Sequence, residues 1–388
     1  MSTRTLQVSA GSLAILALSF AGFICLGLPD GTLAVAWPSM RVLFGREHAD
    51  FGTVLLTHGV TYFLSGLITA RLLSRFATAT LLTAASLFAT SGMLTIASAS
   101  IWPAMLAGIV LIGIGSGVIN TTLNTYASRN FSPRHVNWLH ASYSLGASLG
   151  PLVMTAVIAR QFAWQWGYVL IAVVPLSMAV VHWLNARQWA APSREPTASG
   201  VEPASGFDTL LLRQACLFFC YSGLELTLGR WCYTVLTEWR GLTPEAAGFT
   251  SSCFFGGVFL GRLLLGAVVD RVGPTRMVRM GIMVAVIGTA CYAFANDSLA
   301  AAGLAMTGFA LGPIFPTLIA QASGRFSYSQ LPRVISISVA SAILGSAVVP
   351  YSAGLATNTF GLMAVPVTTV MFAIILVVLH ETLARARR

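Results

Sequence analysis

The sequence predicts an all-α membrane protein with twelve transmembrane helices arranged in two pseudo-symmetric six-helix halves. Of its 388 residues, 56% are hydrophobic and only 9% are charged, whereas soluble domains carry about 25% charged residues. The apolar residues form blocks longer than the roughly 20 residues that a helix needs to cross a bilayer. A soluble globular enzyme is therefore excluded.

Charged residues, prolines and glycines divide the chain into twelve apolar segments. The expected spans are 12–41, 50–74, 78–99, 101–128, 135–160, 164–187, 209–239, 244–270, 274–295, 298–325, 331–357 and 361–384. Residues 189–208 break the apolar pattern with four charged residues and three prolines, which is typical of a flexible linker. We therefore expect an N-terminal bundle (1–188), a cytoplasmic linker (189–208) and a C-terminal bundle (209–388).

The arginines predict how the chain lies in the membrane. All 22 basic residues are Arg, and the formal net charge is +10. With the N-terminus inside, four Arg fall on the outer side, namely Arg41, Arg46, Arg160 and Arg240. Seventeen fall on the cytoplasmic side: Arg4, Arg71, Arg75, Arg129, Arg134, Arg187, Arg194, Arg213, Arg262, Arg271, Arg276, Arg279, Arg325, Arg333, Arg385, Arg387 and Arg388. This excess follows the positive-inside rule and explains the basic charge without a nucleic-acid partner.

The two halves resemble each other at an offset of 196 residues. The offset pairs Gly45 with Gly241 and Gly52 with Gly248. It also pairs Arg75 with Arg271 and Arg129 with Arg325, and matches between the scarcer Arg residues are harder to obtain by chance. Parallel six-helix repeats joined by a linker are the arrangement found in major facilitator transporters.

Several stretches carry a resemblance to that superfamily. GRLLLGAVVDRVG (261–273), in the second half, resembles the signature loop that joins the second and third helices of each half in that superfamily. The first half carries a copy of this loop in which Ser74 stands at the position of Asp270. Three further stretches resemble the fucose/galactose/glucose–proton symporter branch: 27–40, 120–151 and 221–231.

The resemblance implies roles for particular residues. Asp30 matches the first-helix acid of fucose permease, which is implicated in proton coupling, and Asn124 matches an Asn of its fourth helix. Asn120 stands where that permease has a Glu, and Glu225 stands where it has a Gln. This chain thus keeps two membrane acids but has one of them in a different helix.

Asp30 and Glu225 are the candidates for proton coupling. A carboxylate inside a span is unfavourable unless it is paired or hydrated, and burial moves a carboxyl pKa toward neutrality. One repeat before Glu225 lies Pro29, so the two acids occupy almost the same depth in related helices. The alternative is a structural ion pair, with Arg230 as a partner for either acid.

Polar and aromatic residues of spans 4, 5, 1 and 7 are the candidates for solute binding. Asn120 and Asn124 share a helix face, and amides and aromatic rings suit a neutral polyhydroxylated ligand. The alternatives are interhelical hydrogen bonds for the polar residues and interfacial anchoring for the aromatic ones; His58 is expected to be structural. The full set is Asn120, Asn124, His140, Tyr143, Trp37, Tyr221, Trp231 and Arg230.

Charged residues at the cytoplasmic ends of spans 2 and 8 are the candidates for gating. They are Arg71, Arg75, Asp270 and Arg271.

Enzyme motifs do not fit this chain. Residues 146–150 match the G-x-S-x-G pattern of serine hydrolases, but that motif needs a strand–turn–helix elbow and here lies inside an apolar span. The absence of Lys excludes a P-loop, and the six Cys lack metal-ligand spacing. We expect no enzyme, no cofactor and no metal.

The sequence thus favours proton-coupled symport of a small neutral polar solute, such as a monosaccharide, by alternating access. A proton-coupled efflux antiporter of amphipathic compounds is the main alternative, supported by the apolar spans and the Gly/Pro pattern of 146–151. An intramembrane hydrolase or a non-transporting receptor is a third. The expected partners are the solute, protons and the lipid bilayer. We expect a monomer in the inner (plasma) membrane with both termini in the cytoplasm.

Overall fold

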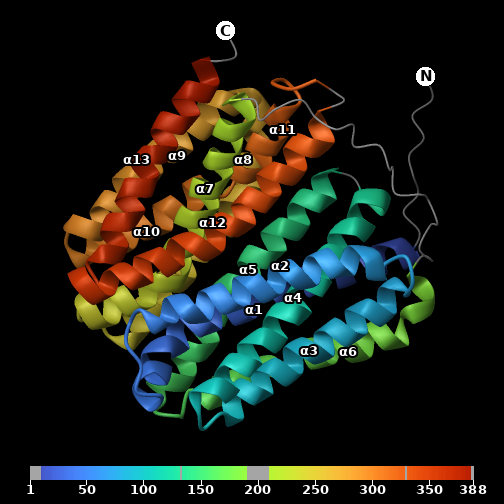
Figure 1. The fold of residues 1–388 in the computed structure, drawn as a ribbon, viewed down its shortest axis with the longest axis horizontal. Coiled ribbons are helices and arrows are strands. Elements are labelled where there is room, and N and C mark those ends of the chain that lie inside the picture. The colour runs from blue at the N-terminus through green and yellow to red at the C-terminus, as the bar shows by residue number, and fades with distance from the viewer. Residues whose placement is uncertain (1–9, 132, 190–208, 328–329, 386–388) are drawn as a thin grey trace.

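The computed structural model describes residues 10–131, 133–189, 209–327 and 330–385, and every regular element within these ranges is a helix (Figure 1). The first half contains α1 (Ala10–Leu43), α2 (Asp50–Leu72), α3 (Thr78–Ser98), α4 (Trp102–Asn130), α5 (Pro133–Ala159), α6 (Gln165–Leu184) and the short η1 (Ala186–Gln188). The second contains α7 (Thr209–Thr234), η2 (Val235–Trp239), α8 (Pro244–Val272), α9 (Pro274–Phe294), α10 (Asp297–Leu311), α11 (Ile314–Ala322), α12 (Leu331–Phe360) and α13 (Ala364–Arg385). Figure 1 shows the blue-to-green and yellow-to-red helices as two bundles side by side.

The helices account for the twelve predicted spans. Within the described residues, eleven helical stretches are long and apolar enough to cross a membrane, and α10 and α11 together form one of them. The helix α7 has 26 residues but is not among the eleven, since it carries Arg213, Glu225 and Arg230. With α7 as the twelfth span, the predicted fold class is confirmed.

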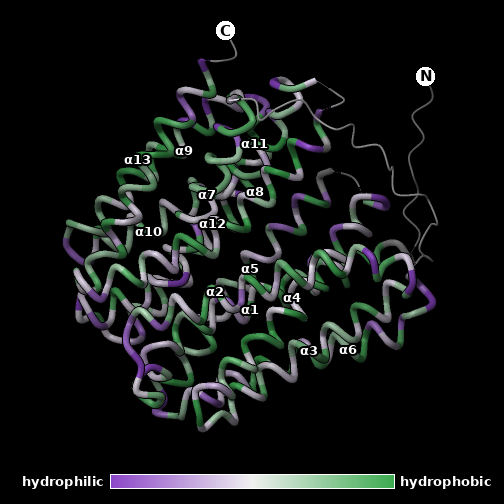
Figure 2. The backbone as a smooth tube through the Cα atoms, in the orientation of Figure 1, coloured by the Kyte–Doolittle hydropathy of each residue, from purple (hydrophilic) through white to green (hydrophobic). Residues whose placement is uncertain are grey.

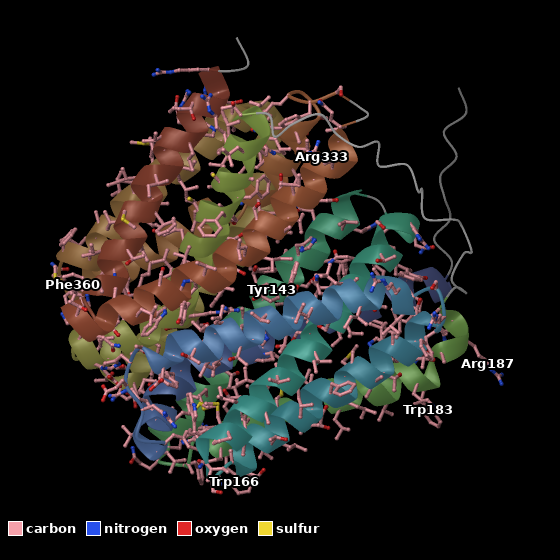
Figure 3. The ribbon with its side chains drawn as sticks, in the orientation of Figure 1. Tyr143, Trp166, Trp183, Arg187, Arg333 and Phe360 are labelled. Atoms are coloured by element: carbon pink, nitrogen blue, oxygen red, sulfur yellow. The ribbon has the colours of Figure 1, made fainter. Side chains whose placement is uncertain are left out.

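The surface of the bundle matches a membrane environment. Hydrophilic stretches of backbone lie mainly at helix ends and turns (Figure 2). The helix α6 carries an exposed tryptophan near each end, Trp166 and Trp183 (Figure 3). They are separated by about 26 Å at 1.5 Å per residue, close to the thickness of the hydrocarbon core at which aromatic side chains anchor a helix on both sides.

The first and seventh spans end in the same kind of turn. Gly45 follows α1 with φ of 60°, and Gly241 follows the seventh span with φ of 73°. Positive φ is readily adopted by glycine because it has no Cβ. These two glycines are one repeat apart, so the internal repeat extends to the backbone conformation.

Glycines bring α1 and α5 into backbone contact. A Cβ on Gly27 would overlap the carbonyl oxygen of Tyr143, and a Cβ on Gly31 would lie 2.5 Å from Cδ of Pro151. From the other side, a Cβ on Gly146 would overlap the carbonyl oxygen of Ile24. Small residues allow such close approach in membranes. Here they hold Asp30 of α1 beside the polar residues of α5.

The tenth span is broken between α10 and α11. Pro313 has no backbone N–H and cannot continue the helix regularly, so α10 ends at Leu311 and α11 begins at Ile314. Two carbonyl groups at the break are bound by side chains of other helices: Tyr221 Oη donates to the Leu311 oxygen (3.0 Å) and Arg262 Nε to the Gly312 oxygen (3.3 Å). Irregular backbone at membrane depth is thus satisfied inside the protein, as it must be.

Two pairs of helices form the main seams between the halves, α5 with α8 and α2 with α12. A Cβ on Gly52 of α2 would lie 3.0 Å from the ring of Tyr351 on α12, and a Cβ on Gly248 of α8 would overlap Thr155 of α5. Gly52 and Gly248 are one repeat apart, and so are Thr155 and Tyr351. The two seams therefore use equivalent positions of the repeat.

Aromatic residues close the end of the molecule that carries the 44–49 turn. The rings of Trp37 and Phe51 stack with centroids 4.9 Å apart, and Trp231 of the second half meets Phe51 edge-on, also at 4.9 Å. All three side chains are fully buried. The start of α1 and the end of α13 lie away from this end (Figure 1).

The predicted linker lies outside the described residues except for its first position. Trp189 is buried and packs edge-on against Tyr126, with ring centroids 4.9 Å apart, and against His182. This residue thus belongs to the packed first half and not to a flexible segment.

Candidate functional site

Asp30 lies at the centre of a buried polar cluster on the junction between the halves. It accepts a hydrogen bond of 2.5 Å from the hydroxyl of Tyr143 on α5 and one of 3.2 Å from Nη2 of Arg230 on α7. Nδ1 of His58 on α2 lies 4.0 Å from the carboxylate. Tyr143 is labelled near the middle of the molecule in Figure 3. Three helices of one half and one of the other thus converge on a single carboxylate.

Arg230 depends on Asp30 as its counter-ion. Within the described residues, the one other acceptor for its guanidinium is the carbonyl oxygen of Ser346, at 3.5 Å, and its Nε has no hydrogen-bond partner. The side chain is 7% exposed. Because a buried guanidinium without a counter-ion is strongly unfavourable, the charge on Asp30 holds Arg230 in place and links α1 to α7.

Glu225 forms a second ion pair, with Arg262 of α8. The distance from Arg262 Nη2 to Glu225 Oε1 is 3.1 Å, and the two side chains are 11% and 6% exposed. Arg262 Nη1 also donates to the carbonyl oxygen of His140 (2.8 Å) and to Oγ of Ser144 (3.0 Å), both on α5 of the other half. The second acid therefore also lies where the halves meet.

The sequence prediction for Arg262 was wrong. Arg262 was counted with the cytoplasmic arginines, but it lies inside α8 and is bound to Glu225. Ten residues separate it from the end of α8 at Val272, about 15 Å of helix. An arginine that deep in an apolar run needs an acidic partner, and this depth is the signal by which the sequence could have revealed it. The sequence left open which acid pairs with Arg230, and in the structure this acid is Asp30.

The two asparagines of α4 bind each other. Nδ2 of Asn124 donates to Oδ1 of Asn120 at 2.9 Å and to its backbone oxygen at 3.0 Å. Both side chains are half-buried. The shared face predicted from their spacing is thus present, and their amides remain grouped as one polar unit.

The aromatic candidates lie in different surroundings. Trp37 and Trp231 pack in the closed end, where Trp231 Nε1 donates to the Pro350 oxygen at 3.1 Å. Tyr221 binds the break in the tenth span. His140 is half-buried, with its ring 5.4 Å from that of Phe23. Of the eight predicted binding residues, Tyr143, Arg230 and Tyr221 contact the acid-containing clusters through their side chains and His140 through its backbone.

The four gating candidates, Arg71, Arg75, Asp270 and Arg271, are exposed at helix ends. Within the described residues none of them forms an ion pair.

A third charged cluster joins the halves at the closed end. Arg41 Nη2 and His48 Nε2 lie 3.0 Å and 3.3 Å from Oε2 of Glu238. We call Arg41, His48 and Glu238 the latch. Burial lowers the pKa of His48 below its usual value and Arg41 acts in the same direction, whereas Glu238 and Glu47 oppose this shift. The sequence analysis placed Arg41 on the outer side and gave no hint of this contact.

Ser148, the serine of the G-x-S-x-G match, is part of the α5–α8 seam. Its Oγ donates to the backbone oxygen of Ser252 at 2.9 Å, and Oγ of Ser252 donates to the Ser148 oxygen at 2.7 Å. The reciprocal pair ties the two helices together, and in the described part of the chain Oγ of Ser148 is bound to Ser252 and not to a His, Asp or Glu. No group of three or more His, Cys, Asp or Glu suited to a metal occurs in the described ranges.

The chain matches the family model of the Major Facilitator Superfamily over residues 19–240 and 226–387. The glucose/mannose transporter GlcP of Bacillus subtilis is 23% identical over 387 aligned positions, which cover 95% of this chain and 94% of the relative. A putative glucose/galactose transporter of Helicobacter pylori is 22% identical, with 65% and 66% covered. Bypass of stop codon protein 6 of Saccharomyces cerevisiae is 22% identical, with 89% and 77% covered.

Solved structures share the fold. A bacterial homologue of the lysosomal transporter Spinster, in an inward-facing unoccupied conformation, aligns with a TM-score of 0.75 at 14% identity and covers 97% of this chain and 98% of its own. The transporter FucP in its outward conformation aligns with a TM-score of 0.65 at 13% identity, covering 96% and 99%. These matches confirm the resemblance seen in the sequence and the prediction that the chain is not an enzyme. The chain belongs to the major facilitator superfamily of membrane transporters.

Proposed function

We propose that this transporter couples proton movement to the symport of a small neutral polar solute, such as a monosaccharide. The observation that carries the proposal is the pair of buried acid–arginine contacts at the junction of the halves, Asp30–Arg230 and Glu225–Arg262.

A neutral solute fits the charge of this region. Each acid is matched by an arginine, so an ionic solute would find no uncompensated counter-charge there. The amides of Asn120 and Asn124 and the hydroxyl of Tyr143 are of the kind that bind sugar hydroxyls. The names of the Bacillus and Helicobacter relatives, which refer to glucose, mannose and galactose, favour a monosaccharide.

The contacts of Asp30 favour it as a carrier of the coupling proton. A proton on Asp30 removes the charge that holds Arg230, and this ion pair links α1 of one half to α7 of the other. Protonation therefore weakens a constraint between the bodies that must move in alternating access. Glu225 is the second candidate carrier, since its partner Arg262 also spans the junction.

The proposal includes an orientation and an assembly. The end that carries the start of α1 and the end of α13 is placed in the cytoplasm, in agreement with the arginine distribution. The protein acts as a monomer in the inner membrane, with the halves 1–188 and 209–388 rocking about the buried pairs. Arg71, Arg75, Asp270 and Arg271 then lie at the cytoplasmic mouth, where they control its opening.

The test uses purified protein in proteoliposomes with a pH-sensitive dye inside. Addition of sugars one at a time is expected to drive inward proton movement for at least one of them. Asp30→Asn and Glu225→Gln are compared for proton-driven accumulation and for downhill exchange. Asp297→Asn is the matched control, because Asp297 is an exposed acid that pairs with Arg240 of the same half. Retained accumulation in both test variants would refute the assignment of the proton.

A second candidate function, efflux of amphipathic compounds, is favoured by one observation. A groove of about 760 Å³ between α8, α9 and α10 reaches the α5–α8 seam at Ser148 and is lined by Met277, Met280, Met306 and Phe309 among others. Such a groove suits a hydrophobic ligand arriving from the bilayer. Outward proton movement on addition of amphipathic cations, with no response to any sugar, would favour this function.

A further inference from the structure

Arg262 makes more contacts than the ion pair with Glu225 requires. Its three guanidinium nitrogens donate to four acceptors in three segments of the chain: Glu225 on α7, the Gly312 oxygen after α10, and the His140 oxygen and Ser144 Oγ on α5. Glu225 and Gly312 belong to the same half as Arg262. His140 and Ser144 belong to the other half. One side chain therefore joins the halves through two neutral acceptors.

The two acceptors on α5 are of a kind that a polyhydroxylated solute can replace. A sugar hydroxyl oxygen accepts a hydrogen bond as Oγ of Ser144 does, and exchange of one neutral acceptor for another changes the free energy little. The charged contact with Glu225 needs no change in this exchange. By contrast, movement of α5 away from Arg262 without a replacement leaves buried guanidinium donors unpaired, which is unfavourable.

We propose that Arg262 is a specificity-determining residue: hydroxyl groups of the solute take over the hydrogen bonds that Arg262 donates to α5 in the empty protein, and this exchange releases α5 from α8. The inference rests on the proposed function and deepens it, since it names the recognised group as hydroxyls that accept from one guanidinium. The exchange of hydrogen bonds also gives the solute a different affinity for the conformation in which Arg262 binds α5 and for the one in which α5 is released. Such a difference is the condition for a ligand to shift an equilibrium.

The first test removes the Ser144 hydroxyl, which competes with the solute for Arg262, and leaves Arg262 in place. In Ser144→Ala, Arg262 loses one acceptor in the empty protein, so the solute gains a donor without having to displace Ser144. The dissociation constant, measured by calorimetry on purified protein, is expected to fall roughly three- to tenfold. Unchanged or weaker binding by Ser144→Ala overturns the inference, because a purely structural role of Ser144 predicts no gain.

Ser148→Ala is the matched control. Ser148 lies one turn further along the same face of α5 and is buried in the same seam, but its hydroxyl binds Ser252 and not Arg262. Its substitution weakens the seam and is expected to leave the dissociation constant within about twofold of the wild type. An equal gain in both variants would mean that seam loosening, and not acceptor exchange at Arg262, governs affinity.

Deoxy analogues and a second variant complete the test. The gain in affinity of Ser144→Ala is expected to vanish for a monodeoxy analogue that lacks the hydroxyl bound by Arg262.

In Arg262→Lys, which keeps the charge but loses the fork of donors, binding is expected to weaken and discrimination against that analogue to disappear. If Ser144→Ala does not fold, Arg262→Lys still tests the inference. If wild-type protein binds no sugar, the proposed function fails and the inference with it. Binding by the wild type with discrimination unchanged in Arg262→Lys refutes the inference alone.

Discussion

Asp30 of α1 and Arg230 of α7 form a buried ion pair of 3.2 Å that joins the two halves of the transporter. The partners are 200 residues apart in the chain. Tyr143 approaches the same carboxylate from α5 because glycines let α1 and α5 touch along their backbones. The geometry of the polar centre thus follows from close helix packing, and the charge on Asp30 is what holds Arg230.

The first prediction concerns the stability of this pair. Asp30→Asn leaves a buried arginine without its counter-ion, and removal of one partner of a buried pair costs about 3–5 kcal/mol. The double variant Asp30→Asn/Arg230→Gln removes both charges and is expected to recover part of this loss. Thermal unfolding in detergent, followed by size-exclusion chromatography, measures both variants against the wild type. A double variant less stable than Asp30→Asn would contradict the dependence of Arg230 on Asp30.

The second prediction compares the two acids. Glu225→Gln is expected to lower the melting temperature less than Asp30→Asn. Arg262 keeps its contacts with Gly312, His140 and Ser144 when Glu225 is neutral. Among the residues that the structure describes, Arg230 keeps only the 3.5 Å contact with the Ser346 oxygen. The same unfolding assay ranks the two variants, and a reversed order would show that these neutral acceptors do not compensate for the lost charge.

The spans and the repeat could be predicted from the sequence because they depend on local hydropathy and on matches at a fixed offset. Gly45 and Gly241, paired in the sequence, both adopt a positive φ in the structure. The break after α10 was not predicted, although the Gly312–Pro313 dipeptide marks it. Pro313 alone does not reveal that Tyr221 and Arg262 bind the freed carbonyls.

The partners of the charged residues could not be predicted in the same way. Asp30 and Glu225 were recognised because a carboxylate inside a span is rare. Arg262 was assigned to the wrong region because the count of arginines on each side of the membrane did not weigh its depth inside the predicted span 244–270. Its pairing with Glu225 depends on how α7 packs against α8, which no local pattern encodes. The contact of Arg41 with Glu238 depends in the same way on the closure of the two halves.

The third prediction concerns the backbone contact between α1 and α5. Gly27→Ala adds a Cβ that overlaps the carbonyl oxygen of Tyr143, so the helices must separate and the 2.5 Å contact between Tyr143 and Asp30 must lengthen. We expect a lower melting temperature and loss of transport. Gly256→Ala is the control, since its Cβ would meet only Oγ of Ser148, at 3.2 Å. Equal loss in both variants would mean that helix propensity or expression, and not this contact, explains the effect.

The fourth prediction concerns the pH dependence of the latch. Burial, aided by Arg41, holds the pKa of His48 below its usual value while Glu238 and Glu47 act in the opposite direction. In an open state His48 is in water and regains the ordinary pKa of about 6.5. The open state then binds a proton more readily than the closed state. Acidification from about pH 8 to about pH 5 therefore favours opening of this end.

Distances between spin labels measure this opening. In a cysteine-free background, labels at the exposed residues Val42 and Phe249 report on the two halves, and the long-distance population is expected to grow as the pH falls. His48→Gln removes the titrating group and is expected to flatten the pH profile. Asp297→Asn is the control, because it breaks a pair with Arg240 that lies within one half, and it should keep the wild-type profile. The closed latch is then the state that loses stability on acidification. A long-distance population that shrinks as the pH falls would contradict this, because it would mean that attraction between protonated His48 and Glu238 outweighs the burial of the imidazole.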